Sequence, residues 1–162
     1  MKTIIVGLGN PILTDDGVGV KVAYALEGIL PAKDNKDVTI TEASVGGLRL
    51  MELLVGYDRA IIIDAIISNN GNVPGTFKKL TLDDLKSISP TQHSASAHDM
   101  SLVTALEMGK WMELHLPDQI AIYAVEVENI NDFNEQSTPA VENAIPIVTK
   151  AVLGDIRPGS TN

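Results

Sequence analysis

The sequence contains no cysteine. This absence excludes a disulfide framework, a thiol nucleophile and a metal site built from thiolates. Long apolar runs are also missing, since none approaches the roughly 18 residues that a membrane-spanning helix needs. The first ten residues, MKTIIVGLGN, lack the apolar stretch and the small-residue cleavage site of a signal peptide. We therefore expect a cytoplasmic protein without membrane insertion.

Positive charge is scarce. Twelve Lys and Arg stand against 21 Asp and Glu, which gives a net charge of −9 at pH 7. Nucleic-acid binders normally carry a basic patch that releases counterions from phosphate, and the nearest approach to one here is Lys78–Lys79. Nucleic acid is therefore not an expected partner, whereas a metal ion or a basic peptide is compatible with this charge.

The 162 residues contain no internal repeat, no low-complexity tract and no interdomain linker. Their length is that of one domain, and we expect a single α/β domain over residues 1–153 followed by a frayed tail, 154–162. Hydrophobic periodicity predicts the elements within the domain. Strands are expected at 3–7, 38–42, 60–66, 76–80 and 119–127, and helices at 18–30, after Gly46–Gly47, at 97–114 and after Thr138.

Alternation of strands and helices predicts a three-layer α/β/α sandwich around a mostly parallel, five-stranded twisted sheet. Residues 60–66, AIIIDAI, are apolar on both faces apart from one aspartate, as in a central parallel strand. Residues 76–80 contain paired lysines, which are typical of an edge strand. We expect this edge strand to be antiparallel.

The loop between the first strand and the first helix reads GLGNPILTDDGVG, residues 7–19. A dinucleotide-binding loop needs three suitably spaced glycines, but the third position here is Ile12, and Pro11 removes a backbone donor. Two adjacent aspartates at the start of a helix would also repel a phosphate. The loop therefore favours a cation as its ligand.

Three polar residues are predicted to meet at the carboxyl edge of the sheet, where open α/β sheets bind ligands. Asp16 ends the first loop, and Asp64 lies near the end of the third strand. His98 lies in the first turn of a helix that returns to a parallel strand, and its spacing from Leu102 places it on the inward face. A helix N-terminus disfavours imidazolium, and neutral imidazole is the form that binds metal. Two carboxylates and one imidazole suit a divalent ion of borderline softness.

Each of these residues also has a purely structural interpretation. Asp15 or Asp16 could cap the helix that begins near Gly17, and Asp15 is the expected cap. Asp64 could accept backbone hydrogen bonds at the end of its strand. His98 lies in a pattern that resembles a capping box.

The other two histidines have weaker claims to the site. His93 lies in a loop rich in Ser and Gln, as an exposed residue or a mobile ligand. His115 follows the far end of the helix at 97–114, where a histidine interacts favourably with the helix dipole.

These residues resemble those of the hydrogenase maturation endopeptidases, which trim the C-terminus of the large subunit of nickel–iron hydrogenases. The resemblance covers most of the chain. It rests on GLGNPILTDDGVG at 7–19, Gly46–Gly47–Leu48, AIIIDAI at 60–66, SAHDMSL at 96–102 and the C-terminal segment 126–148.

The resemblance implies a peptidase without a Ser or Cys nucleophile, whose metal-contacting and catalytic positions match Asp16, Asp64 and His98. Some members carry Glu at the first position, so Asp16 reaches one methylene less far. The ion is expected to be nickel carried by the substrate, a large-subunit precursor, and the cut falls beyond its C-terminal metal-binding motif. Asp16 could serve as a ligand or as a base. A monomer is expected.

Other functions are compatible with some of these features. A nickel-binding checkpoint or chaperone module would use the same three side chains without cutting anything. Bacterial peptidyl-tRNA hydrolases also carry GLGNP after an N-terminal strand, but their histidine shortly after the loop and their basic surface are missing here. A flavodoxin-like domain would need a loop rich in Ser and Thr around the phosphate, and the Asp15–Asp16 pair argues against it.

Overall fold

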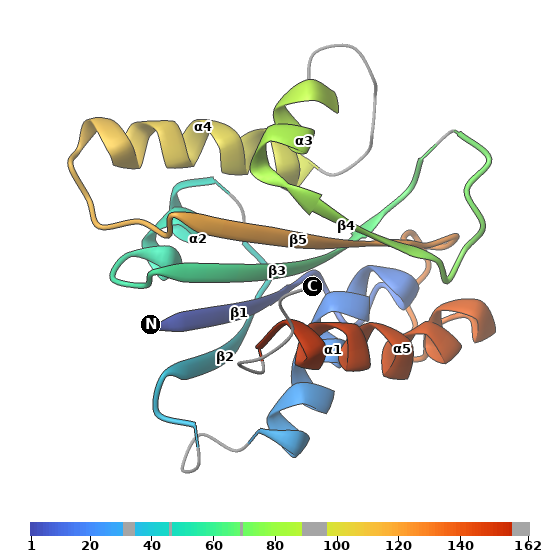
Figure 1. Cartoon of the computed structure of the whole chain (residues 1–162). Helices are drawn as coiled ribbons and strands as arrows, with labels where there is room; N and C mark the ends of the chain where they lie inside the picture. The colour runs from blue at the N-terminus through green and yellow to red at the C-terminus, as the bar shows by residue number, and fades with distance from the viewer. Residues whose placement is uncertain (31–34, 46, 69, 89–96, 157–162) are drawn as a thin grey trace.

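The structure is a computed structural model, and it describes residues 1–30, 35–45, 47–68, 70–88 and 97–156. For 86–88 and 97–101 it describes only the backbone. Figure 1 shows the elements, which are β1 (Thr3–Leu8), the 3-10 helix η1 (Thr14–Gly17), α1 (Val18–Ile29), β2 (Val38–Ala43), α2 (Gly47–Leu54), β3 (Arg59–Ile66), β4 (Phe77–Thr81), α3 (Leu82–Ile88), α4 (Ala97–Trp111), β5 (Gln119–Glu126) and α5 (Pro139–Ile156).

The strands form one five-stranded sheet in the order β2-β1-β3-β5-β4. All neighbours are parallel except β4, which pairs with β5 in the antiparallel direction at the edge. The central position of β3 explains its sequence, because helices cover both of its faces and leave only its two end residues partly exposed. The predicted fold class, including the antiparallel edge strand, is confirmed.

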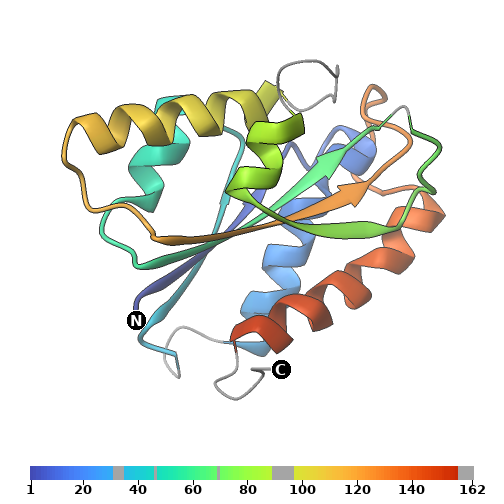
Figure 2. The ribbon, with the colours of Figure 1, turned by 45° about the horizontal axis from the view of Figure 1, so that its top comes forward.

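Helices cover both faces of the sheet, as Figures 1 and 2 show. On one face α1 and α5 pack on alternate residues of the central strands, such as Ile61 and Ile63 of β3. On the other face α2, α3 and α4 pack on the intervening residues, such as Ala60 and Ile62. The period of two along the central strands therefore assigns their buried residues alternately to the two helical layers.

Two glycines let α1 approach the sheet closely. A Cβ atom added to Gly7 of β1 would collide with the carbonyl oxygen of Gly19 in α1. One added to Gly19 would collide with the carbonyl oxygens of Ile63 and Leu8. The glycines of the first loop thus serve helix–strand packing, which fixes the start of α1 beside the carboxyl ends of β1 and β3.

Several features differ from the expected elements, including the 3-10 helix η1 and the end of α4 at Trp111 rather than at 114. The helix α3 follows β4 directly and was not expected, since Leu82 and Leu85 supply only a short apolar pattern. The helix α5 continues to Ile156, so Gly154 and Asp155 are helical, and residues 157–162 lie outside the described residues. In the described part of the chain, no helix is long and apolar enough to cross a membrane.

Candidate functional site

Asp16 is fixed by the loop that follows β1. The backbone N–H of Asn10 donates to Oδ2 of Asp16 at 2.8 Å, and the N–H of Asp16 donates to the carbonyl oxygen of Leu13 at 3.0 Å. Gly9 allows this tight loop, because its φ of +130° is open to glycine and because a Cβ there would collide with the carbonyl oxygen of Asp16. The carboxylate of Asp16 is therefore held in place while its residue stays half-buried.

Asp64 lies in β3, paired with Ala124 of β5. It is only 2% exposed, and its Oδ1 accepts the backbone N–H of Ala65 at 2.9 Å. By alternation it faces the same side as Ile62, which is the side covered by α2 and α4. The hydrogen bond to Ala65 agrees with the structural interpretation, and the location at the carboxyl end of β3 agrees with the functional one.

The packing of α1 brings Asp16 and Asp64 to the same sheet edge. Gly19, three residues after Asp16, abuts the carbonyl oxygen of Ile63, the residue before Asp64. The 3-10 helix η1, which contains Asp16, also contacts β3. The backbone segments that carry Asp16 and Asp64 thus lie beside each other at this edge, as the topology predicts.

His98 lies in the first turn of α4, as expected, but its side chain is outside the described residues, and so is all of His93. Figures 1 and 2 show that α4 begins toward the carboxyl ends of β3 and β5 and runs back along the sheet. Among the side chains that the structure describes, no three His, Asp or Glu residues form a group that could hold a metal ion. The triad of Asp16, Asp64 and His98 remains a prediction.

Asp15 does not cap α1, so the expectation for this residue is wrong. The N-cap of α1 is Gly17, which makes no side-chain cap hydrogen bond. Asp15 instead points into the protein, with 0% exposure, and accepts the N–H and Oγ1–H of Thr138 at 2.8 and 3.0 Å. It also accepts the backbone N–H groups of Glu128 and Asn129. These donors need an acceptor because the loop is packed against η1, and Asp15 supplies it.

His115 lies at the opposite end of the sheet. Its Nε2 is 3.2 Å from Oδ1 of Asp58, just before β3 begins, and both side chains are exposed. The pKa of Asp58 lies below its ordinary value, mainly because its carboxylate accepts a hydrogen bond from the backbone N–H of Lys2 and, to a smaller extent, because it accepts one from His115. His115 therefore belongs to a surface pair remote from Asp16 and Asp64.

Glu126 is a buried carboxylate that the sequence interpretation missed. It ends β5 at the same edge as Asp64, and it accepts the backbone N–H of Ser68 at 2.7 Å and its hydroxyl at 3.0 Å. The sequence signal that could have indicated this residue is a glutamate at the end of an apolar strand. Its contacts brace the segment after β3, which borders the candidate site.

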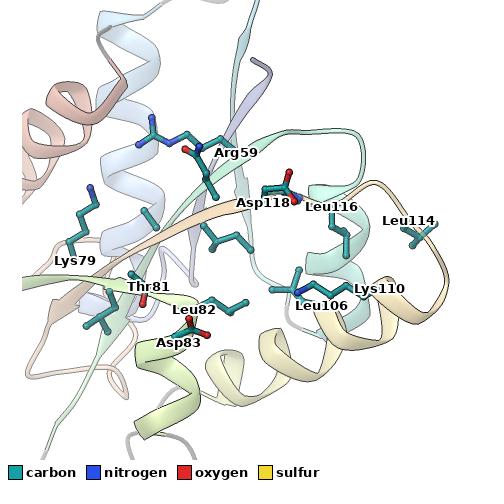
Figure 3. A pocket seen from close by; sticks show the side chains of 15 residues that line it. Arg59, Lys79, Thr81, Leu82, Asp83, Leu106, Lys110, Leu114, Leu116 and Asp118 are labelled. Atoms are coloured by element: carbon teal, nitrogen blue, oxygen red, sulfur yellow. The ribbon is translucent and has the colours of Figure 1, made fainter. Parts of the chain in front are cut away.

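A cavity of about 650 Å³ lies at the amino edge of the parallel strands, where β3 and β5 begin with Arg59 and Gln119 (Figure 3). Leucines of α3, α4 and the loop after α4 line it together with Lys79 and Lys110. Neither Asp16 nor Asp64 is among the residues that line it. This cavity is therefore separate from the candidate site.

The sequence model of the hydrogenase maturation protease family, HycI, matches residues 20–155. The chain belongs to the hydrogenase maturation protease family. It is 29% identical over 159 residues to the hydrogenase 2 maturation protease of Escherichia coli, covering 97% of this chain and 92% of that protein. It is 30% identical over 164 residues to a putative hydrogenase maturation protease of Methanocaldococcus jannaschii, covering 95% and 96%.

Solved structures of the family share the fold. The hydrogenase maturating endopeptidase HybD of Escherichia coli superposes with a TM-score of 0.82 at 28% identity, over 99% of this chain and 94% of that one. The HybD protease of Thermococcus kodakarensis, at 21% identity and a TM-score of 0.72 over 97% and 100%, supports the fold alone. The family match begins after the loop of residues 7–19, but these longer alignments span nearly the whole chain. Family membership makes the protein an enzyme, a peptide-bond hydrolase.

Proposed function

We propose that this protein is the endopeptidase that removes the C-terminal extension of a nickel–iron hydrogenase large-subunit precursor after nickel has been inserted. The observation that supports the proposal is the contact of Gly19 with the carbonyl oxygen of Ile63, which places the backbone segments carrying Asp16 and Asp64 at the carboxyl edge, in a chain of the maturation protease family. The absence of cysteine excludes a thiol nucleophile and thiolate ligands.

In this proposal Asp16, Asp64 and His98 contact the nickel that the precursor carries. Two carboxylates and a neutral imidazole are hard and borderline donors, which suit a divalent ion such as nickel. When present, such an ion supplies Lewis-acid polarisation of a carbonyl or lowers the pKa of a water. The nickel is then part of the substrate, so a precursor that lacks it is not cut.

The protein's own residues position the reaction. The N–H of Asn10 holds one oxygen of Asp16, so the carboxylate keeps one orientation as the substrate binds. Asp64 is buried, and the low-polarity surroundings strengthen its interaction with a cation that approaches the edge. If Asp16 serves as base instead of ligand, its half-buried location leaves a water within reach.

The test is incubation of the protein with nickel-loaded and nickel-free precursor, followed by the mass of the large subunit. We expect the loaded precursor alone to lose its extension. Asp16→Asn, Asp64→Asn and His98→Ala should each slow the cut by at least about a hundredfold, as expected for a lost acid–base or ligand group. His115→Ala is the matched control, since this histidine lies at the other end of the sheet.

The outcomes separate the protease from a binding module. A loaded precursor that binds the protein and keeps its full mass would support the non-catalytic checkpoint instead. Equal cleavage of loaded and nickel-free precursor would contradict the role of nickel. Cleavage that survives all three substitutions would show that the three side chains are not the site.

A further inference from the structure

Two apolar side chains stand exposed beside the candidate site. Phe133, in the loop between β5 and α5, is 83% exposed, and Ile12, in the loop after β1, is 46% exposed. The two loops lie side by side, because Leu13 and Asn134 form a parallel bridge and the N–H of Asn134 donates to the carbonyl oxygen of Ile12 at 2.9 Å. Each apolar residue directly precedes a bridged residue, so Ile12 and Phe133 are neighbours.

Hydrogen bonds hold the loop on which Phe133 is exposed. The hydroxyl of Thr14 donates to the carbonyl oxygen of Asp132 at 2.7 Å, and the N–H of Thr14 donates to that of Asn134 at 2.9 Å. The side chain of Asn129 accepts the N–H of Asp132 within the loop. A pair of exposed apolar side chains that lie side by side on ordered loops forms an apolar patch rimmed by polar residues, and such patches occur at protein–protein contact sites.

This pair of loops is close to Asp16 and not to the cavity of Figure 3. The N–H of Asp16 donates to the carbonyl oxygen of Leu13, the residue after Ile12, at 3.0 Å. Ile12 is therefore one turn from the carboxylate that we assign to the site. Ile12 and Phe133 thus lie on the loops that border Asp16.

The charged residues of the loop that bears Phe133 are all acidic. Between Lys110 and Lys150 the sequence has no Lys or Arg and seven Asp and Glu. Three of these acidic residues, Glu128, Asp132 and Glu135, are exposed on the loop that bears Phe133. Lys21 of α1 reaches the end of this loop, where it donates a hydrogen bond to the Ser137 hydroxyl at 2.7 Å. Electrostatic complementarity calls for a basic partner.

We propose that Ile12, Phe133 and the carboxylates of Glu128, Asp132 and Glu135 form a docking surface for the folded body of the precursor. This inference rests on the proposed function, and it names what the partner presents, an apolar recess flanked by Lys or Arg. The surface binds the body of the substrate while Asp16 and Asp64 meet its C-terminal segment. Residues of this surface should set affinity and partner choice without taking part in the cut.

The experiment measures kcat and KM for cleavage of nickel-loaded precursor. Phe133→Ala and Ile12→Ala should raise KM by about tenfold and leave kcat within about twofold, because uniform binding is lost. Glu135→Lys should raise KM at low salt, with an effect that shrinks at high salt. Trp111→Ala is the matched control, since Trp111 is 85% exposed but ends α4 at the far end of the sheet.

The possible results are distinct. If the unmodified protein cuts the precursor and Phe133→Ala has the same KM as Trp111→Ala, the docking surface is wrong and the proposed function stands. If the unmodified protein neither binds nor cuts the precursor, both are overturned. If Phe133→Ala instead converts a dimer to a monomer in sedimentation with KM unchanged, the surface joins two copies of this chain and the inference fails.

Discussion

Asp15 accepts the backbone N–H of Thr138 at 2.8 Å across 123 positions of sequence. Thr138 immediately precedes α5, so this hydrogen bond ties the start of the last helix to the loop of the candidate site. Asp15 and Asp16 are adjacent, yet Asp15 is fully buried and joins distant segments, whereas Asp16 is half-buried and its carboxylate accepts the N–H of Asn10 within its own loop. The buried carboxylate thereby fixes the backbone on which Asp16 is carried.

We expect Asp15→Ala to lower the free energy of unfolding by about 3 kcal/mol, because several buried donors would lose their acceptor. Asp15→Asn keeps one acceptor oxygen and should lose about half as much. Urea unfolding monitored by circular dichroism measures both. Glu107→Ala, an exposed acidic residue on α4, is the control and should stay within about 0.5 kcal/mol. A small loss for Asp15→Ala would mean that water replaces the carboxylate at no cost.

Two glycines of α1 should respond to alanine with opposite signs. Gly19→Ala would drive a methyl group into the carbonyl oxygens of Ile63 and Leu8, so we expect a loss of about 3 kcal/mol or failure to fold. Gly28 has nothing within 4 Å of its added Cβ, so Gly28→Ala should stabilise the protein by about 0.5 kcal/mol. Denaturant midpoints compare the two. Equal stability of the two variants would contradict the close contact of α1 with the sheet.

Asp155 should make the stability depend on pH in acid. Burial raises its pKa, but hydrogen bonds from Lys79 at 2.6 Å and Tyr123 at 2.7 Å, with the charges of Lys79 and Arg59, outweigh this and lower it below 3.8. Because the folded pKa lies below the unfolded one, the contribution is complete above pH 3.8 and is lost as pH falls through the folded pKa.

Asp155→Asn should therefore cost about 1 kcal/mol at pH 7, a modest value because solvent screens the partly exposed pair, and almost nothing near the acid limit of the folded state. Thermal unfolding of both proteins across the acid range measures the difference. Burial and then Asp155 raise the pKa of Tyr123, so its hydroxyl remains the donor throughout. A difference that stays constant with pH would show that the carboxylate charge contributes nothing.

The fold class could be predicted from local sequence patterns, because each of these patterns has one physical cause in the sheet. AIIIDAI is apolar on both faces since helices cover both faces of β3, and the paired lysines of β4 suit a strand with one open edge. The sequence did not predict the helix α3, because this helix is short and is stabilised by packing of Leu85 rather than by a marked hydrophobic periodicity.

The site was predictable only in part. The topology of a parallel sheet is enough to bring Asp16 and Asp64 to one edge, whatever their side chains contact. The role of Asp15 was not predictable, because its hydrogen-bond partners lie more than a hundred positions away in the sequence. Capping rules consider only hydrogen bonds to the first turn of the adjacent helix. Glu126 was missed for the same reason, since its partner Ser68 belongs to a different loop.

Asp64 offers the sharpest separation of function from stability. Its carboxylate is buried at 2% exposure, and a buried charge needs hydrogen bonds or an opposite charge to offset its lost hydration. In Asp64→Asn the side chain keeps its size and an oxygen that can accept the N–H of Ala65, so we expect the variant to fold and to lose no more than about 2 kcal/mol of unfolding free energy. Precursor cleavage should nevertheless fall by at least about a hundredfold.

Unfolding in urea and cleavage of nickel-loaded precursor, measured on the same preparation, decide between the two interpretations of Asp64. A large loss of stability with cleavage reduced only in proportion to the folded fraction would make Asp64 a structural acceptor. A stable variant that no longer cuts makes it a residue of the site, because natural active sites keep charges that the fold alone would not favour. The negative charge of Asp64 is then what cleavage requires, since the variant keeps the size of the side chain and an acceptor for the N–H of Ala65.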